Sequence, residues 1–362
     1  MPYWRALYGL IATGLLTAQV KYSNEFLKIG VGARAAGLGN AQVAAAVDAT
    51  AAYWNPAALV ETPNYPQLVL MHSEYFASVA KYDYGTLALS LPENRRLALS
   101  FIRLGIDDIP NTLRFYDGIS YDFGRITRFS VADMAAYLSY AQWLRDTALA
   151  IGGSVKVIHR LLGPFATAWG FGLDAGLFYR RGPWRAGLVL YDGTSTFNAW
   201  TFNTEAFETA FLLTGNAIPQ NSIEWTRPSL RVGVAYKLLA HRPLSLWPMA
   251  DVVVFTDGPR NALLVGRPLS ADLSVGLEVS YKQWAALRLG LTNFQRAVTA
   301  SGQRTFTFYP TTGVGVRIWH FGLDYALANF TGFSQGLYSH LISLRLDFHP
   351  SLTRRLLPAK GG

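Results

Sequence analysis

The stretch DLSVGLEVSYK, residues 272–282, decides the fold class because its side chains alternate strictly in character. One face of an extended chain would carry Leu273, Val275, Leu277, Val279 and Tyr281, and the other Ser274, Gly276, Glu278, Ser280 and Lys282. This period of two is the pattern of a two-faced β-strand. The same alternation recurs from Gln67 to Phe348. The sequence therefore predicts an all-β protein built from a long series of strands.

We expect fourteen strands, separated by connections that alternate between short and long. The expected strands are roughly 67–78, 81–91, 95–104, 131–143, 147–160, 167–181, 184–192, 228–240, 243–255, 272–282, 284–294, 308–318, 319–329 and 338–348. Short turns at one end and long loops at the other are typical of outer-membrane barrels, whose long loops lie outside the cell. The pattern predicts a transmembrane antiparallel β-barrel over residues 67–348.

The composition favours a barrel over a soluble β-domain. Only 15% of the 362 residues are charged, whereas 51% are hydrophobic; soluble domains carry about 25% charged residues. The mature region lacks the ~20 consecutive apolar residues of a membrane-spanning helix. A lipid-facing chain without such helices satisfies its backbone hydrogen bonds in a closed barrel. Periodicity alone leaves open whether the apolar face points outward to lipid or inward to a core.

The formal charge of +9 does not indicate nucleic-acid binding, because Lys and Arg are scattered and form no basic run longer than a pair. Anionic lipid headgroups or a cationic lumen explain this excess. The chain contains no cysteine, so disulfides and thiolate sites are excluded. Aromatic residues near the expected strand ends fit a girdle at the headgroup boundary: Trp143, Trp169, Tyr179, Trp184, Tyr191, Tyr281, Trp284 and Trp319.

The two ends of the sequence are interpreted as an export signal and a C-terminal tail. Arg5 followed by the apolar run 6–16 predicts a Sec signal peptide over residues 1–18. An N-terminal segment, 19–66, then precedes the barrel, and residues 349–362 form a periplasmic tail. The expected location is therefore the outer membrane of a Gram-negative-type bacterium.

Residues 26–59, FLKIGVGARAAGLGNAQVAAAVDATAAYWNPAAL, form a glycine- and alanine-rich block with few charges. A dinucleotide-binding loop would need a preceding buried strand and a following helix, and neither is expected here. Its glycines are better explained by tight packing or by positive φ angles. The marker residues of this block are Gly30, Gly32, Arg34, Gly37, Gly39, Trp54, Asn55, Pro56 and Ala57.

A set of charged residues falls on the lumen-facing side of the expected strands: Arg231, Glu278, Arg288, Arg317, Asp324 and Arg345. Asp324 lies between strands that carry Arg317 and Arg345, which suggests a charge ladder across the last three strands. These charges either solvate and brace the interior or seat a plug and steer a ligand.

The long loop 193–227 contains an apolar helical spacing. Phe202, Phe207 and Phe211 mark it as a candidate partner-binding loop, since exposed apolar surface often indicates an interaction. The same residues could equally form a small core within the loop. Both alternatives stay open from the sequence.

Enzymatic and cofactor chemistry is not expected. The six histidines are isolated and lack metal-ligand spacing. Residues 332–336, GFSQG, match the nucleophile-elbow pattern by letter, but that elbow requires a strand-to-helix turn, and this one falls in a loop between two expected strands. We expect no metal, no cofactor and no catalysis.

The N-terminal block closely resembles the signature of the PorV/PorQ family of outer-membrane barrels, which are related in fold to FadL-type transporters. The resemblance rests on Gly30, Gly32 and Ala33-Arg34-Ala35, on Gly37-Leu38-Gly39 and Asp48-Ala49-Thr50, and on Tyr53-Trp54-Asn55-Pro56-Ala57. It implies a fourteen-stranded FadL-like barrel. In FadL-type proteins an Asn-Pro-Ala motif belongs to a hatch that plugs the lumen, so the resemblance implies the same role for residues ~26–60.

The family resemblance also implies a function in the type IX secretion system of the Bacteroidota and their relatives. A non-enzymatic barrel would then bind cargo C-terminal domains or translocon partners through its long loops. The alternatives are a FadL-type channel for hydrophobic small molecules, with a hydrophobic ligand in its lumen, and a structural scaffold of an envelope complex.

Overall fold

The computed structural model describes residues 22–75, 78–116, 118–144, 148–239, 243–298, 304–328 and 339–350. The expected signal peptide, the tail beyond residue 350 and the 332–336 motif lie outside these ranges. None of the helices in the described ranges is long and apolar enough to cross a membrane.

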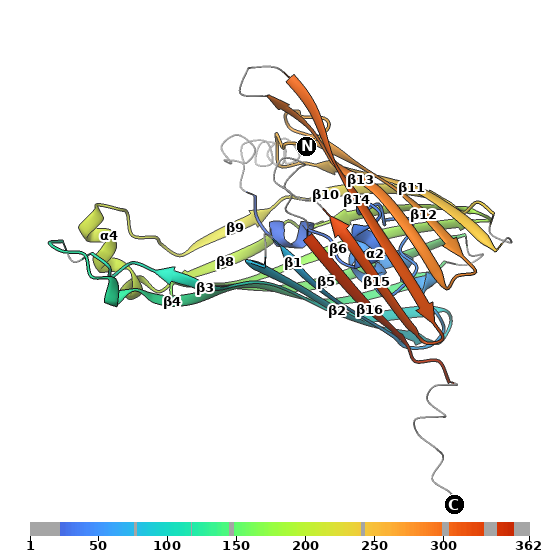
Figure 1. Cartoon of the computed structure of the whole chain (residues 1–362), viewed down its shortest axis with the longest axis horizontal. Helices are drawn as coiled ribbons and strands as arrows, with labels where there is room; N and C mark the ends of the chain where they lie inside the picture. The colour runs from blue at the N-terminus through green and yellow to red at the C-terminus, as the bar shows by residue number, and fades with distance from the viewer. Residues whose placement is uncertain are drawn as a thin grey trace, which may run out of the picture.

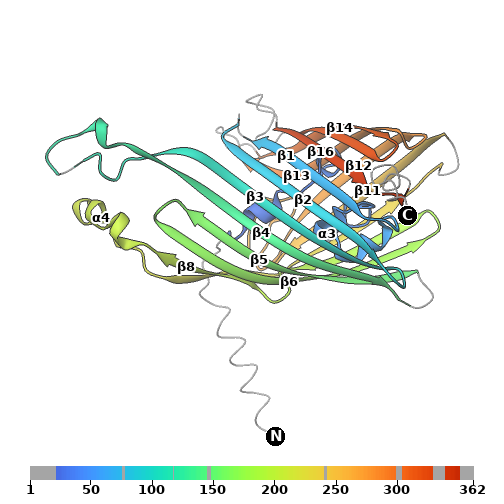
Figure 2. The ribbon, with the colours of Figure 1, turned by 90° about the horizontal axis from the view of Figure 1, so that it is seen from below.

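Fourteen antiparallel strands close into a barrel (Figures 1 and 2). They are β1 (Gln67–Tyr75), β2 (Ala80–Leu91), β3 (Arg95–Asn111), β4 (Thr127–Trp143), β5 (Leu149–Leu162), β6 (Ala166–Arg181), β7 (Trp184–Tyr191), β10 (Ser229–Tyr236), β11 (Leu244–Phe255), β12 (Ser270–Tyr281), β13 (Ala285–Val298), β14 (Arg304–Ile318), β15 (Phe321–Ala328) and β16 (Ser339–Asp347). The closing pair is β1 with β16, where Gln67 faces Asp347. The predicted fold is confirmed, and each of the fourteen expected strands has its counterpart.

The apolar faces of the strands point outward. Along β13, Leu287 and Leu289 are 49% and 51% exposed, whereas Arg288 between them is buried. Along β12, Ser274 and Glu278 are buried on the lumen side. A lipid-facing exterior with a polar interior requires this orientation. The structure thus decides the question that periodicity left open.

Two further strands were not predicted from the sequence. β8 (Thr196–Phe202) and β9 (Ser222–Thr226) form a hairpin that pairs with the first half of β6. Together with the ends of β3 and β4, this hairpin projects beyond the barrel as an arm at the left of Figure 1. The arm also contains η3 (Phe123–Arg125), η4 (Thr204–Ala206) and α4 (Glu208–Thr214). We call this end of the molecule the long-loop end and the opposite one the short-turn end.

Five of the eight predicted girdle aromatics divide into two groups. Trp184, Trp284 and Trp319 are 56%, 50% and 83% exposed at the short-turn end, as a headgroup girdle requires. Trp143 instead packs against Phe178, and the Tyr191 hydroxyl donates to the Trp54 carbonyl oxygen. For these two residues the girdle prediction is wrong, because their strand register directs them into the lumen.

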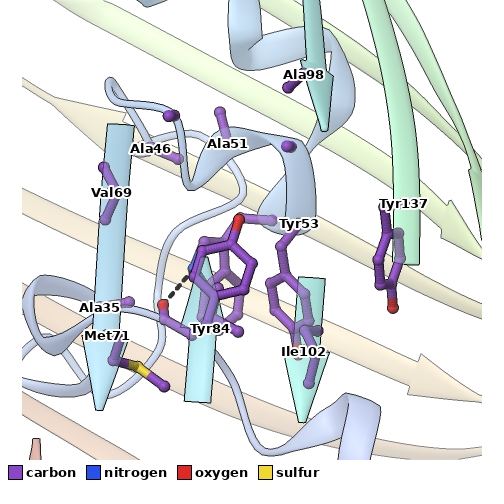
Figure 3. Close-up of a cluster of buried hydrophobic side chains, with 14 of the residues drawn as sticks. Ala35, Ala46, Ala51, Tyr53, Val69, Met71, Tyr84, Ala98, Ile102 and Tyr137 are labelled. Atoms are coloured by element: carbon purple, nitrogen blue, oxygen red, sulfur yellow. Dashed lines mark hydrogen bonds between the residues drawn. The ribbon is translucent and has the colours of Figure 1, made fainter. Parts of the chain in front are cut away.

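The N-terminal segment, residues 24–62, lies inside the barrel, where Figures 1 and 2 show it in blue. It contains η1 (Glu25–Lys28), α2 (Ala33–Ala36), α3 (Ala51–Trp54) and η2 (Pro56–Glu61). α2 contacts β14, β15 and β16, whereas η2 contacts β3 to β6 on another part of the wall. Alanines of the segment and inward side chains of the strands form the main buried cluster, part of which is drawn in Figure 3. The core of the protein is therefore the lumen itself.

Candidate functional site: the N-terminal segment and its cavities

Glycines allow the N-terminal segment to lie directly against the wall. Gly30, Gly32 and Gly39 adopt positive φ angles of 98°, 90° and 63°, which glycine tolerates far better than other residues. The Gly39 N–H donates to the Thr311 hydroxyl at 3.0 Å. A Cβ added at Gly290 would lie only 2.1 Å from the Gly39 nitrogen. Backbone-to-wall packing of this closeness explains the glycines of the block without a phosphate ligand.

Asn55-Pro56-Ala57 is held in a cradle of wall glycines. Asn55 is fully buried, and its Nδ2 donates to the carbonyl oxygens of Val43 and Leu177, each at 3.0 Å. Its Oδ1 accepts from the Ala57 N–H and so caps η2, with Pro56 at the first position. A Cβ would come within 2.4 Å of this motif at Gly152, 2.3 Å at Gly176 and 2.8 Å at Gly187. These three glycines lie on β5, β6 and β7.

Arg34 connects the N-terminal segment to the wall through buried ion pairs. Its Nε lies 2.9 Å from the Glu278 carboxylate, and its Nη1 donates to Gln42 and to the Ala45 carbonyl oxygen. Glu278 also pairs with Arg288 at 2.8 Å, and Arg288 pairs with Asp324 at 2.7 Å. All four side chains are at most 15% exposed. We call this chain of contacts the Arg34 network.

The predicted charge ladder is wrong in its pairings. Asp324 is bridged to Arg288, two strands away, and Arg317 pairs with Asp347 at 2.7 Å. Gly315 lies on the intervening strand, where a Cβ would be 2.3 Å from Asp324 Oδ1 and 2.7 Å from Arg288 Nη1. The glycine therefore leaves room for the bridge across β14. The Arg231 guanidinium lies 5.4 Å from the centroid of the Trp54 ring, where it makes a cation–π contact with the N-terminal segment.

The strand pairing of the barrel wall is interrupted between β7 and β8, a feature that was not predicted from the sequence. Ala175 of β6 pairs with Leu190 of β7, whereas Phe171 of β6 pairs with Phe197 of β8. A step of four residues along β6 therefore corresponds to a step of seven residues from β7 to β8. The extra residues form the turn 192–195, in which the Gly193 N–H donates to the Leu173 carbonyl oxygen. Arg227-Pro228 separates β9 from β10 at the same level. We call this region the wall break.

A buried ion triad spans the wall break. Lys156 Nζ lies 2.8 Å from Asp174 and 2.6 Å from Asp192, and all three side chains are at most 8% exposed. Asp192 also accepts a hydrogen bond from Thr196, the first residue of β8. Lys156 is flanked by two valines in its strand, a pattern from which a buried carboxylate partner could have been predicted. Nothing in the sequence places Asp192 beside it.

Cavities lie on both sides of the wall break. The inner cavity has a volume of about 80 Å³ and is lined by Tyr53, Tyr137, Tyr191 and Val253, together with Lys156 and Arg231. On the outer surface an apolar groove of about 540 Å³ is lined by Leu97, Leu138, Leu173, Leu190, Gly193 and Thr194. Asp174 lines both. The ion triad therefore separates a groove on the lipid-facing side from a cavity beside the N-terminal segment.

The candidate loop aromatics lie in the arm. Phe207 is 5% exposed and packs against Phe165 and Phe211, at ring-centroid distances of 6.4 Å and 4.9 Å. Phe202 stacks on Trp200. Of the two alternatives left open, the structure supports a small core within the arm for Phe207. Partner binding by this loop stays a prediction.

The start of the N-terminal segment is tied to loop 256–269 by charge. Arg260 Nη2 lies 2.9 Å from Glu25, and Arg260 Nε donates to Asp257 at 2.8 Å. Burial raises the pKa of both carboxyls, but the hydrogen bonds and charge of Arg260, with Lys28 nearby, lower each pKa below its ordinary value of 4.5 for Glu25 and 3.8 for Asp257. Both groups consequently favour the folded state when they are ionised.

Acidification is expected to loosen this attachment. A carboxyl with a lowered folded-state pKa contributes stability above its unfolded pKa and loses it as the pH falls through the folded value. Protection of residues 24–28 against hydrogen exchange should therefore decline once the pH drops below about 4.5, after correction for the intrinsic exchange rate. Arg260→Gln should remove most of this dependence, whereas Arg95→Gln at the exposed start of β3 should leave it intact. Equal pH profiles for the wild type and Arg260→Gln would contradict this assignment.

Comparisons with known proteins support the fold. No family model matches the chain, and no curated protein matches it. Among solved structures, the CymD monoaromatic hydrocarbon channel is similar with a TM-score of 0.54 and 15% identity, over 89% of this chain and 98% of that one. The Ralstonia pickettii toluene transporter TbuX matches with 0.54 and 15%, over 88% and 99%. A Pseudomonas aeruginosa FadL homologue matches with 0.51 and 11%, over 88% and 98%. The chain is a closed fourteen-stranded antiparallel β-barrel with a FadL-like fold.

Proposed function

We propose that this barrel is an outer-membrane channel that admits hydrophobic small molecules through the wall break and past the N-terminal segment. The observation that carries the proposal is the inner cavity, which faces the apolar outer groove across the wall break. A molecule dissolved in the membrane would reach the cavity there without passing through the arm. The solved channels of similar fold, described as transporting toluene and monoaromatic hydrocarbons, support the same class of cargo.

The N-terminal segment would act as the hatch. It contacts several strands around the wall and buries nearly all of its residues between them. Passage to the short-turn end would then require the segment to shift or part. Under this proposal Asn55-Pro56-Ala57 and the Arg34 network hold the closed state.

Uptake of a labelled hydrocarbon tests this proposal. In a bacterial host whose own FadL-type channels are deleted, the barrel should raise the accumulation of radiolabelled toluene several-fold over the empty vector. Val253→Trp should abolish the gain, because an indole would occupy much of the inner cavity that Val253 lines. Leu289→Trp, on the exposed outer face, is the matched control and should transport normally. A wild-type protein that gives no more accumulation than the vector would refute the channel.

The expected role in type IX secretion stays a prediction. No matching family model or curated protein supports it. Gentle detergent extraction followed by mass spectrometry addresses it directly. Recovery of secretion components or cargo C-terminal domains, together with absent hydrocarbon uptake, would favour that function over the channel.

A further inference from the structure

A second cavity lies at the short-turn end, apart from the inner cavity. Its volume is about 160 Å³, and we call it the basal cavity. Five cationic side chains line it: Arg34, Lys237, Arg288, Arg317 and Arg345. Only two carboxylates, Glu278 and Asp324, line it with them. The channel proposal gives this surplus of positive charge no role.

Most of these cations are already neutralised by carboxylates. Arg34 and Arg288 share Glu278 and Asp324 within the Arg34 network, and Arg317 pairs with Asp347. Within the part of the chain that the structure describes, Lys237 and Arg345 form no ion pair with a carboxylate. Two positive charges therefore remain uncompensated around one half-open cavity. Unpaired cations in a site of restricted solvent access attract anions more strongly than surface cations do.

Buried hydrogen-bond donors point to the same conclusion. Trp247 lines the basal cavity and is 5% exposed, yet its indole N–H has no hydrogen-bond partner among the described residues. The Arg345 Nε is also buried and unpaired. Three cations, on Arg34, Arg185 and Lys237, approach the Trp247 ring at 5.3, 4.9 and 5.5 Å from its centroid. Mutual repulsion among them would fall if an anion entered.

We propose that the basal cavity binds small molecules through a carboxylate or phosphate group, with Lys237 and Arg345 as the charge partners. An oxyanion supplies the acceptors that the unpaired donors lack, and charge-assisted hydrogen bonds are the strong ones. The inference goes beyond the proposed channel and does not depend on it, because it concerns a different cavity and different residues. An anion held there would meet the hatch from its short-turn side, next to the Arg34 network.

Calorimetric titration of the full-length protein in a non-ionic detergent tests the site. The probes are inorganic phosphate and benzoate, with benzyl alcohol as the neutral counterpart of benzoate, all at constant ionic strength. We expect saturable binding of phosphate or benzoate. Binding should weaken about tenfold or more in Lys237→Gln and in Arg345→Gln, because each removes a hydrogen bond from a charged donor. Arg95→Gln, an exposed arginine at the same end, should bind like the wild type.

The probes separate two sources of the anion. Binding of phosphate alone identifies a free inorganic ion, and binding of benzoate but not benzyl alcohol identifies the acid group of an organic molecule. Equal binding of benzoate and benzyl alcohol, or no measurable binding of any probe, would overturn the proposal. So would unchanged affinity in both glutamine variants.

A measurement of thermal stability distinguishes an anion-binding role of Arg345 from a purely structural one. Without added anion, Arg345→Gln should unfold at the same temperature as the wild type or higher, since it removes an unpaired charge. A lowered unfolding temperature with unchanged anion affinity would make Arg345 a structural brace and refute its assigned role. The hydrocarbon uptake assay is independent of these readouts, so failure of either proposal would be recognised separately.

Discussion

Glu278→Gln is expected to release the N-terminal segment from the wall while the barrel stays folded. Glu278 is the carboxylate shared by Arg34 and Arg288, so its loss leaves the buried Arg34 guanidinium without a paired carboxylate. Removing one partner of a buried ion pair costs about 3–5 kcal/mol. This cost destabilises the docked position of the N-terminal segment relative to the released one, because Arg34 belongs to the segment and Glu278 to β12.

Trypsin cleavage after Arg34 measures the release. Arg34 is 8% exposed in the docked state, so cleavage there requires the segment to move. A penalty of 3–5 kcal/mol corresponds to a rise in the open population of roughly a hundred- to several-thousandfold. Glu93→Gln is the matched control: it removes an exposed pair with Arg95, which contributes at most about 1 kcal/mol.

A second substitution distinguishes charge from packing. In Arg34→Met with Glu278→Gln the unpaired guanidinium of the segment is gone, while Arg288 keeps Asp324. Docking should then recover in large part, as buried ion pairs are often replaceable by apolar groups. Residues 24–62 should again resist proteases with other specificities. If the double variant is as open as Glu278→Gln alone, unpaired charge is not the cause of the release.

The sequence predicted the barrel well because its signal is local. Alternation along each strand fixes which residues share a face, as with Ser274 and Glu278 on the lumen side of β12, and the turn lengths fix the order of the strands. The same local signal predicted that Arg231, Glu278, Arg288 and Asp324 point inward. It did not reveal β8 and β9, whose mixed aromatic and polar residues belong to an arm beyond the barrel.

Pairings inside the lumen could not be predicted, because they depend on where the N-terminal segment lies. Glu278 finds its partner Arg34 at a separation of 244 residues, which strand periodicity does not encode. Arg288 reaches Asp324 across β14 only because residue 315 is glycine. The Lys156 triad likewise forms where the register shifts by three residues at the wall break. An insertion of that kind has no periodic signature.

Locking the N-terminal segment to the wall by a disulfide is expected to abolish transport. The chain has no cysteine, so an introduced pair has no competing thiol. The Ala33 N–H donates to the Ser343 hydroxyl at 2.8 Å, which places a sulfur at position 343 within reach of one at position 33. Ala33→Cys with Ser343→Cys should therefore form a bond between α2 and β16 on oxidation.

The control for this lock is a disulfide within the wall. Ser139 and Ser154 face each other on β4 and β5 with hydroxyl oxygens 2.7 Å apart, so the Ser139→Cys, Ser154→Cys pair cross-links two strands of the wall. This pair removes the 3.3 Å hydrogen bond from Ser139 to the Ala52 carbonyl oxygen but does not tie the segment to the wall. Hydrocarbon accumulation should fall to the empty-vector level in the oxidised 33–343 pair, return with reductant, and remain normal in the 139–154 pair. A barrel that transports equally well with the 33–343 bond closed would pass its cargo beside a stationary α2, and residues 33–36 would not be part of the gate. Loss of transport in both pairs would instead place the moving element in the wall itself, at β4 and β5, which line the outer groove.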